Sequence, residues 1–179
     1  MRAIIFHGTG GSPDSYWIPY IKQSLQDRGY EVIVPQLPNT DNPNLKDSLD
    51  AALVLPYDHE TILIGHSSGA ALILSVLESI EVKVRQVILV AGFFEPLNPP
   101  EPELMVQSSY DWEKIKSHCE KFVFINSDND PWGCTDNVGK AMQEKLGGEL
   151  VVPTGEGHMG STTFNQPYRE FPLLLKLIT

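Results

Sequence analysis

The residues with the clearest chemical potential are a serine and two glycines near it, in the segment Gly65-His66-Ser67-Ser68-Gly69. An apolar run, Thr61–Ile64, precedes this segment, and a run with helical periodicity, Ala70–Ile80, follows it. A GxSxG sequence between a strand and a helix is typical of a nucleophilic serine on a strained turn, where larger side chains at the glycine positions would collide with the backbone. A serine that only caps a helix is the simpler interpretation. We favour the nucleophile because strand, turn and helix occur together.

A serine nucleophile needs a base, and two histidines follow Ser67 in the chain. His118 lies in the charged stretch Trp112–Glu120, which we predict to be helical, and we expect it to be a solvated surface residue. His158 lies in a glycine-rich loop after the last predicted strand, where α/β-hydrolases hold the catalytic histidine. We therefore predict that His158 is the general base.

The carboxylate that orients this base should follow the predicted strand Phe122–Ile125, where two candidates stand. Asp130 directly precedes Pro131, whose fixed backbone angle stiffens the loop. Asp128 is the alternative, although such a residue also forms turns of its own. We favour Asp130, so the predicted triad is Ser67, Asp130 and His158.

An acyl-transfer site also needs N–H donors for the oxyanion that forms on the substrate. The residue after the nucleophile, Ser68, should supply one. The loop His7–Ser12 follows the first predicted strand and should supply the other, by position the backbone N–H of Thr9, although a simple flexible turn is the alternative. Tyr16 and Trp132 are expected to line the substrate pocket, because they stand near the carboxyl ends of strands.

The elements that must position these residues are short apolar runs that alternate with stretches of helical periodicity. Near-continuous apolar runs are typical of strands buried on both faces of a parallel sheet. We predict strands at Ala3–Phe6, Glu31–Val34, Thr61–Ile64, Gln86–Val90, Phe122–Ile125 and Glu149–Val152. Helical faces are predicted from Trp17/Ile21/Leu25, Leu45/Leu49/Leu53 and Leu72/Val76/Ile80, and a closing helix from Phe171–Ile178. This alternation predicts an α/β fold in one domain, residues 1–179, with a three-layer, doubly wound, mostly parallel six-stranded sheet.

One segment interrupts the alternation. Residues Gly92–Ser109 include Pro96, Pro99, Pro100 and Pro102 and three glutamates. Proline cannot donate to a hydrogen-bonded ladder, so we expect a loop or small flap at the carboxyl end of a strand, near the pocket.

Composition limits the classes of function. A chain of 179 residues with 41% apolar and 20% charged residues is typical of one globular domain. Its net charge of −10 repels polyanions, so we expect neither nucleic acid nor membrane as a partner. The two cysteines lack metal-ligand spacing, and no targeting or membrane-spanning segment is recognised, so we expect a cytoplasmic protein with no metal or organic cofactor.

With these residues, the chain resembles the small retinoblastoma-binding-protein-9-like (YdeN-like) serine hydrolases over nearly its whole length. The resemblance is carried by the HG loop at the start, Trp17, and the segments Gly65–Ala70, Trp112–Lys116, Ser127–Pro131 and Gly157-His158. It implies a minimal α/β-hydrolase fold without a large cap, and it supports the aspartate before proline, Asp130, as the acid. It also implies hydrolysis of small carboxylic esters or amides, aminoacyl esters among them, through an acyl-enzyme.

Two departures from the family pattern stand out. After Asp-Pro-aromatic the family commonly has a hydrophobic-Pro step, whereas Trp132 is followed here by Gly133-Cys134-Thr135, so the pocket near Trp132 is expected to differ. The family name also refers to a partner recognised through a Leu-x-Cys-x-Glu motif. The comparable stretch here is Leu55-Pro56-Tyr57-Asp58-His59, so we do not carry that partner over.

Two other classes of function were weighed against the hydrolase. A non-catalytic protein-binding module on a hydrolase scaffold is the main alternative, because one fold hosts several functions. The complete triad in hydrolase order favours an enzyme. A dinucleotide-binding enzyme is the second alternative, but its GxGxxG loop would need glycine where Pro13 stands.

Overall fold

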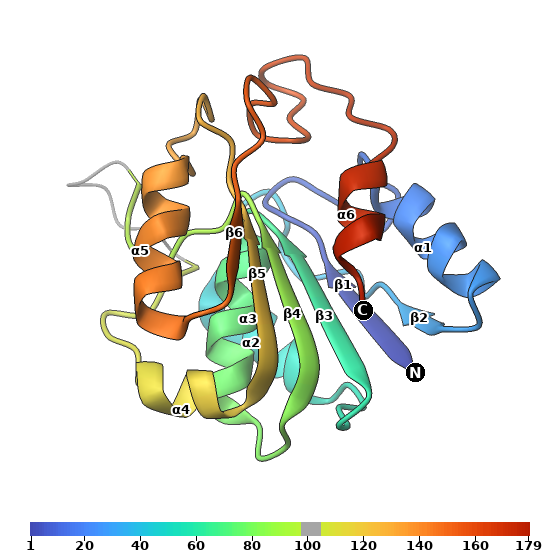
Figure 1. The fold of residues 1–179 in the computed structure, drawn as a ribbon, viewed down its shortest axis with the longest axis vertical. Helices are drawn as coiled ribbons and strands as arrows, with labels where there is room; N and C mark the ends of the chain where they lie inside the picture. Colours follow the sequence, from blue (N-terminus) through green and yellow to red (C-terminus); the bar gives the residue numbers. More distant parts are fainter. Residues whose placement is uncertain (98–104) are drawn as a thin grey trace.

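A six-stranded sheet forms the centre of the structure, a computed structural model that describes residues 1–97 and 105–179 (Figure 1). The order of the strands across the sheet is β2-β1-β3-β4-β5-β6, and each neighbouring pair is parallel. The strands are β1 (Arg2–Phe6), β2 (Glu31–Ile33), β3 (Thr61–His66), β4 (Val84–Val90), β5 (Cys119–Ile125) and β6 (Glu149–Val151). The predicted α/β fold is therefore confirmed, and the described sheet is parallel throughout.

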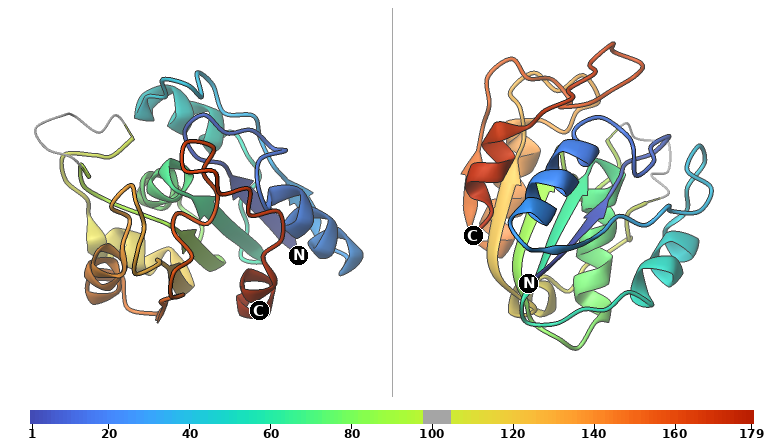
Figure 2. Two further views of the ribbon diagram at one scale, coloured as in Figure 1. Left: turned by 90° about the horizontal axis from the view of Figure 1, so that it is seen from above. Right: turned by 90° about the vertical axis from the view of Figure 1, so that its right-hand side faces the viewer.

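Within the described residues, six helices cover the two faces of this sheet (Figure 2). They are α1 (Ile18–Asp27), α2 (Leu45–Leu53), α3 (Ser68–Ser79), α4 (Trp112–Ser117), α5 (Asp136–Leu146) and α6 (Pro172–Leu177). One hydrophobic core joins α1 and α6 to the sheet, and a second core joins α2, α3, α4 and α5 to the other face. Because both faces are covered, the central strands are buried along nearly their whole length, as their apolar sequences require.

The helices at the N-terminal half illustrate how local sequence sets these elements. Trp17 precedes α1 and is fully buried, as the helical spacing indicated. The side chain of Asn44 accepts a 2.9 Å hydrogen bond from the backbone N–H of Asp47, which caps the start of α2. The predicted face of α2 was wrong at one position, because Leu53 is 39% exposed while Ala52 is buried.

A second boundary also differs from the sequence prediction. The stretch Trp112–Glu120 is not one helix: α4 ends at Ser117, and β5 begins at Cys119. His118 lies between them and is half-buried, with Nδ1 2.9 Å from the carbonyl oxygen of Leu77. The expectation that it is a solvated surface residue was therefore wrong.

The predicted proline-rich flap is described only in part. Its residues 98–104, with Pro99, Pro100 and Pro102, lie outside the described residues. Where the chain is described, no helix combines the length and the apolar character that a membrane crossing needs.

Candidate active site

Ser67 lies on the sharp turn between β3 and α3. Its backbone angles are φ 55° and ψ −122°, a conformation that is strained for a residue with a side chain. The N–H of Ser67 donates a 2.9 Å hydrogen bond to the carbonyl of Val90 in β4, which holds the strained turn against the sheet. The turn therefore presents the Ser67 side chain at the carboxyl end of the sheet.

The two glycines of the turn are required by close backbone contacts. A Cβ atom on Gly65 would lie 2.6 Å from the carbonyl oxygen of Gly69 and 2.6 Å from Cα of Ala70. A Cβ atom on Gly69 would lie 2.6 Å from the carbonyl oxygen of His7, which follows β1. Glycine at both positions thus lets α3 begin directly against the ends of β1 and β3.

His158 and Asp130 form a buried pair next to this turn. Asp130 lies in the loop of residues 126–135 after β5 (the aspartate loop), and His158 lies in the loop of residues 152–160 after β6 (the histidine loop). The distance from Nδ1 of His158 to Oδ2 of Asp130 is 2.7 Å. Because an ionised carboxylate only accepts hydrogen bonds, Nδ1 carries the ring proton and Nε2 has a free lone pair. The ring can therefore take up a proton at Nε2.

Asp128, the other candidate carboxylate, contacts a different partner. Its Oδ1 accepts a 2.8 Å hydrogen bond from the backbone N–H of Gly155, and its side chain lies at the surface. The other oxygen of Asp130, by contrast, accepts a 2.8 Å hydrogen bond from the backbone N–H of Trp132. The structure thus brings Asp130 to the histidine, whereas Asp128 joins the two loops at their outer side.

Two more side chains of the aspartate loop bind the histidine loop. Oγ of Ser127 donates to the carbonyl of Pro153 at 3.0 Å and accepts from the N–H of Glu156 at 3.1 Å. Oδ1 of Asn129 accepts from the N–H of Gly157 at 2.8 Å. These contacts fix one loop against the other, so the distance between Asp130 and His158 does not depend on their own hydrogen bond alone.

The backbone of His158 is held from two other parts of the chain. Its N–H donates to Oε1 of Gln166 at 2.9 Å, and its carbonyl accepts from Nε2 of His66 at 2.9 Å. Trp17 also donates from Nε1 to the carbonyl of Met159 at 2.9 Å. Sequence reasoning missed the positioning contacts of His66 and Gln166. No sequence pattern pointed to either contact; in the structure, a Cβ atom on Gly157 would overlap the Gln166 side chain.

His66 is buried beneath the ring of His158, with their ring centroids 5.0 Å apart. Burial, together with the proximity of His158, lowers the pKa of His66 to about 3. His66 is therefore neutral at physiological pH, with its proton on Nε2 for the hydrogen bond to the His158 carbonyl.

The loop after β1 lies against Ser67. The backbone N–H of Leu37 donates to Nε2 of His7 at 3.1 Å, so the proton of His7 is on Nδ1, which donates to the carbonyl of Gly8 at 3.0 Å. Burial lowers the pKa of His7 and favours this neutral ring. A Cβ atom on Gly8 would lie 3.0 Å from Cβ of Ser67. This close approach places Thr9 beside the turn, where its Oγ1 donates to Oγ of Ser68 at 3.0 Å.

A pocket of about 510 Å³ opens above these residues. The sequence-predicted residues that line it are Thr9, Tyr16, Ser67, Ser68, Trp132 and His158, with Asp130 behind His158. Sequence reasoning did not name Phe93 or Asp41 individually, and both also line the pocket, as does Leu97; Phe93 and Leu97 belong to the proline-rich segment. The lining thus combines apolar side chains, Trp132 among them, with polar ones.

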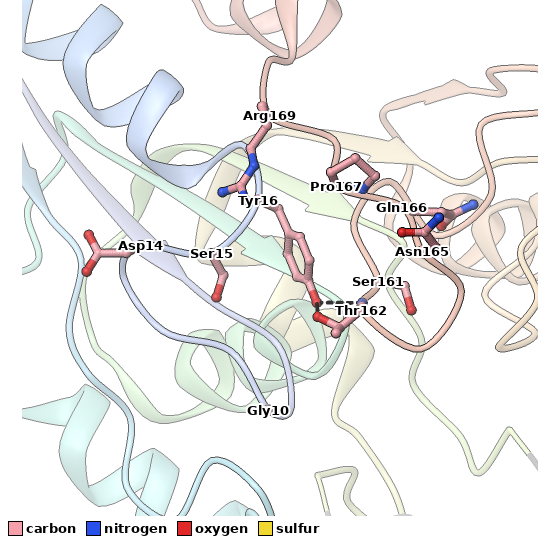
Figure 3. A pocket seen from close by; sticks show the side chains of 10 residues that line it. All are labelled: Gly10, Asp14, Ser15, Tyr16, Ser161, Thr162, Asn165, Gln166, Pro167 and Arg169. Carbon is pink, nitrogen blue, oxygen red and sulfur yellow. Dashed lines mark hydrogen bonds between the residues drawn. The ribbon is translucent and has the colours of Figure 1, made fainter.

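Tyr16 separates this pocket from a second hollow of about 350 Å³, shown in Figure 3. The hydroxyl of Tyr16 accepts a 3.1 Å hydrogen bond from the backbone N–H of Thr162 and lies 3.1 Å from its Oγ1. Asp14 and Arg169 line the far side of the second hollow. Tyr16 is therefore a wall of the pocket rather than its floor.

The chain is similar to known proteins in both sequence and structure. The model of a family described as "Serine hydrolase" matches residues 3–177. The chain is 32% identical over 136 residues to YdeN of Bacillus subtilis, named as a hydrolase, covering 72% of this chain and 70% of that protein. It is 27% identical over 179 residues to the serine hydrolase RBBP9 of Rattus norvegicus, covering 94% and 92%. The crystal structure of the ydeN gene product of B. subtilis superposes with a TM-score of 0.89 at 24% identity, covering 98% of this chain and 95% of that one.

Proposed function

The chain belongs to the serine hydrolase family, and on this premise we propose that it cleaves small carboxylic esters or amides, aminoacyl esters among them, through an acyl-enzyme on Ser67. The observation that carries the proposal is the buried 2.7 Å hydrogen bond between His158 and Asp130, beside the pocket that Ser67 lines. A histidine held in this way is the base that a serine hydroxyl needs to become a nucleophile.

The first half of the reaction forms the acyl-enzyme. Oγ of Ser67 attacks the acyl carbonyl while Nε2 of His158 accepts its proton, and Asp130 stabilises the imidazolium that results. His158 then returns the proton to the leaving alcohol or amine. In the second half, water loses a proton to the same nitrogen, attacks the acyl-enzyme and releases the carboxylic acid.

The tetrahedral oxyanion needs preorganised donors, and we assign these to the backbone N–H groups of Thr9 and Ser68. The first turn of α3 supplies the N–H of Ser68, where the helix dipole also favours negative charge. The side-chain bond between Thr9 and Ser68 supports a fixed spacing between the two donors. Each such donor lowers the activation free energy by about 3–4 kcal/mol in comparable sites.

The pocket limits the substrate to small molecules. Its volume of about 510 Å³ is in the range of sites for small ligands. Phe93, Leu97 and Trp132 provide contacts for an apolar acyl group, and Asp41 and Thr162 add polar groups to the lining. We therefore propose that the apolar residues hold the acyl chain and the polar residues hold the leaving group.

Labelling with a fluorophosphonate probe tests the nucleophile directly, because such probes react with an activated serine. We expect the protein to be labelled, and both Ser67→Ala and His158→Ala to lose labelling and hydrolysis of a panel of small esters and aminoacyl esters, by about 10⁴-fold or more. Both variants should keep the circular dichroism of the unmodified protein.

Matched controls are available at exposed positions of the same residue types. Ser117→Ala and His59→Ala lie away from the pocket lining and should be labelled like the unmodified protein. Undiminished labelling of a folded Ser67→Ala variant would show that another residue is the nucleophile. Absence of labelling in the folded, unmodified protein would contradict the proposal.

A further inference from the structure

We infer that Asp130, Cys134 and His158 form a binding site for Zn²⁺, and that the bound ion inhibits the hydrolase. One ligand atom from each of these residues lies within 4.8 Å of the other two, and all three side chains are buried. The inhibition rests on the function proposed above, whereas the binding of the ion does not.

The three ligand atoms have the chemistry that zinc prefers. Zn²⁺ binds cysteine sulfur, histidine nitrogen and carboxylate oxygen, at about 2.3 Å for sulfur and about 2.0–2.2 Å for the other two. In a tetrahedral site these bond lengths place neighbouring ligand atoms roughly 3.4–3.6 Å apart. The observed spacing, within 4.8 Å, therefore needs shifts of roughly 1 Å to enclose the ion. Mg²⁺ and Ca²⁺, which prefer sets of oxygen ligands, do not fit a site with a thiolate.

Two of the ligands belong to one tight turn. The backbone N–H of Gly133 donates to the carbonyl of Asp130 at 3.2 Å, which folds the chain so that Cys134 returns toward the carboxylate. Nδ2 of Asn126, fully buried, donates to the carbonyl of Cys134 at 2.9 Å and fixes the end of the turn. The backbone that carries the thiol is thus fixed before any ion binds, which lowers the entropic cost of assembling the site.

The ion reaches the site through the substrate pocket, because His158 lines that pocket and stands in front of Asp130. Asp41 lines the same pocket, and the chain carries a net charge of −10, so the local concentration of cations is raised.

Binding of zinc removes the base. The Cys134 thiol releases its proton to solvent as the Zn–S bond forms, and the hydrogen bond between His158 and Asp130 breaks. If the ion takes Nε2, the lone pair needed by Ser67 is occupied. If it takes Nδ1, the displaced ring proton is carried on Nε2, which then cannot accept another. In both cases His158 no longer activates the serine.

Cd²⁺ provides a readout of binding that does not depend on activity, because a cadmium–thiolate bond absorbs in the ultraviolet. We expect this band on titration of the unmodified protein and of Ser67→Ala, and its loss in Cys134→Ala. Cys119→Ala is the matched control, since Cys119 is also a buried thiol, and it should keep the band. Cys134→Ser is the second variant if Cys134→Ala does not fold.

Inhibition is then measured as the Zn²⁺ concentration that halves ester hydrolysis. Cys134→Ala should keep its basal activity and need at least about tenfold more Zn²⁺, the scale of loss seen when a metal site is weakened. Mg²⁺ should have no effect, and a chelator should restore activity. Absence of the thiolate band, or equal inhibition of Cys134→Ala and the unmodified protein, would overturn the inference. A protein that binds Cd²⁺ through Cys134 but hydrolyses no ester would contradict the proposed function and leave the metal site standing.

Discussion

At the scale of single residues, Asp128 and Asp130 show how two similar side chains two positions apart take different roles. Asp130 is buried, and its two oxygens contact the ring of His158 and the backbone of Trp132. Asp128 is exposed, and its contact with Gly155 needs only an acceptor oxygen. A neutral amide can replace that acceptor, but it cannot stabilise an imidazolium.

The substitution Asp130→Asn should therefore reduce kcat by about 10⁴-fold, because the amide presents the wrong partner to Nδ1 of His158. Asp128→Asn is the matched control and should retain kcat within about threefold, since its amide oxygen can still accept from Gly155. Steady-state hydrolysis of one ester by both variants measures the difference. An equal loss of kcat in the two variants would contradict the assignment of Asp130.

Part of the candidate site was predictable from the sequence. Ser67 and His158 were predicted because each lies in a glycine-containing loop whose position relative to a strand is typical of hydrolases. The structure brings these residues and Asp130 to one pocket, and their catalytic roles stay predictions. The supports of His158 were not predicted, because no sequence pattern indicates that Gln166, eight residues further along the chain, or His66, 92 residues earlier, bonds to its backbone.

At the scale of elements, the turn between β3 and α3 is the most demanding part of the fold. The first turn of α3 lies directly against the end of β1, with no space for a methyl group on Gly69. Gly29, which follows α1, also has a positive φ, of 84°, but no neighbouring atom lies within 4 Å of a Cβ built there. A Cβ atom at Gly69 would therefore cost free energy through steric overlap, whereas one at Gly29 would cost free energy only through the backbone conformation.

We predict that Gly69→Ala lowers the free energy of unfolding by about 3 kcal/mol or more, since backbone atoms must move to make room. Gly29→Ala should cost only about 1 kcal/mol, the usual cost of placing a Cβ atom at positive φ. Urea unfolding of the two variants measures both values. Similar losses in the two would show that the contact between α3 and β1 is not tight.

The presence of each strand was easier to predict than the exposed faces and the boundaries of the helices. The apolar runs identified all six described strands because a strand buried on both faces leaves a continuous signal. Periodicity alone did not place the exposed side of α2, where the small residue Ala52 packs inward and Leu53 does not. It also did not separate α4 from β5, because charged residues continue in the sequence from the short helix into the start of the strand.

At the scale of the whole molecule, stability is coupled to the neutral state of two buried histidines. His66 and His7 both have pKa values lowered by burial, and Nε2 of His7 also accepts a hydrogen bond that only the neutral ring can accept. Protonation of either ring in the folded state costs free energy, whereas the unfolded chain takes up these protons near the ordinary pKa of 6.5. The unfolded state therefore binds more protons below that pH.

The free energy of unfolding should consequently be highest above pH 6.5 and fall as the pH is lowered from 6.5 toward 3, the folded pKa of His66. The slope that His66 contributes approaches about 1.4 kcal/mol per pH unit. Urea unfolding at decreasing pH measures it, and His66→Gln should show a shallower slope. His59→Gln, a change at an exposed histidine, should follow the unmodified protein. A steep slope that survives in His66→Gln would contradict this account.

The supports of the histidine loop also set an order of events as the chain emerges during synthesis. Trp17 is followed 142 residues later by its partner Met159, and His66 is followed 92 residues later by its partner His158. Four central strands precede His158 in the sequence, so most of the sheet can pair before this histidine has been made and docked against its supports. The serine turn can thus form on a chain that is still being made, but the proposed hydrolysis needs residues 158–166 to be made and docked. A proposed catalytic centre whose parts lie so far apart in the sequence delays its reactivity until folding is well advanced.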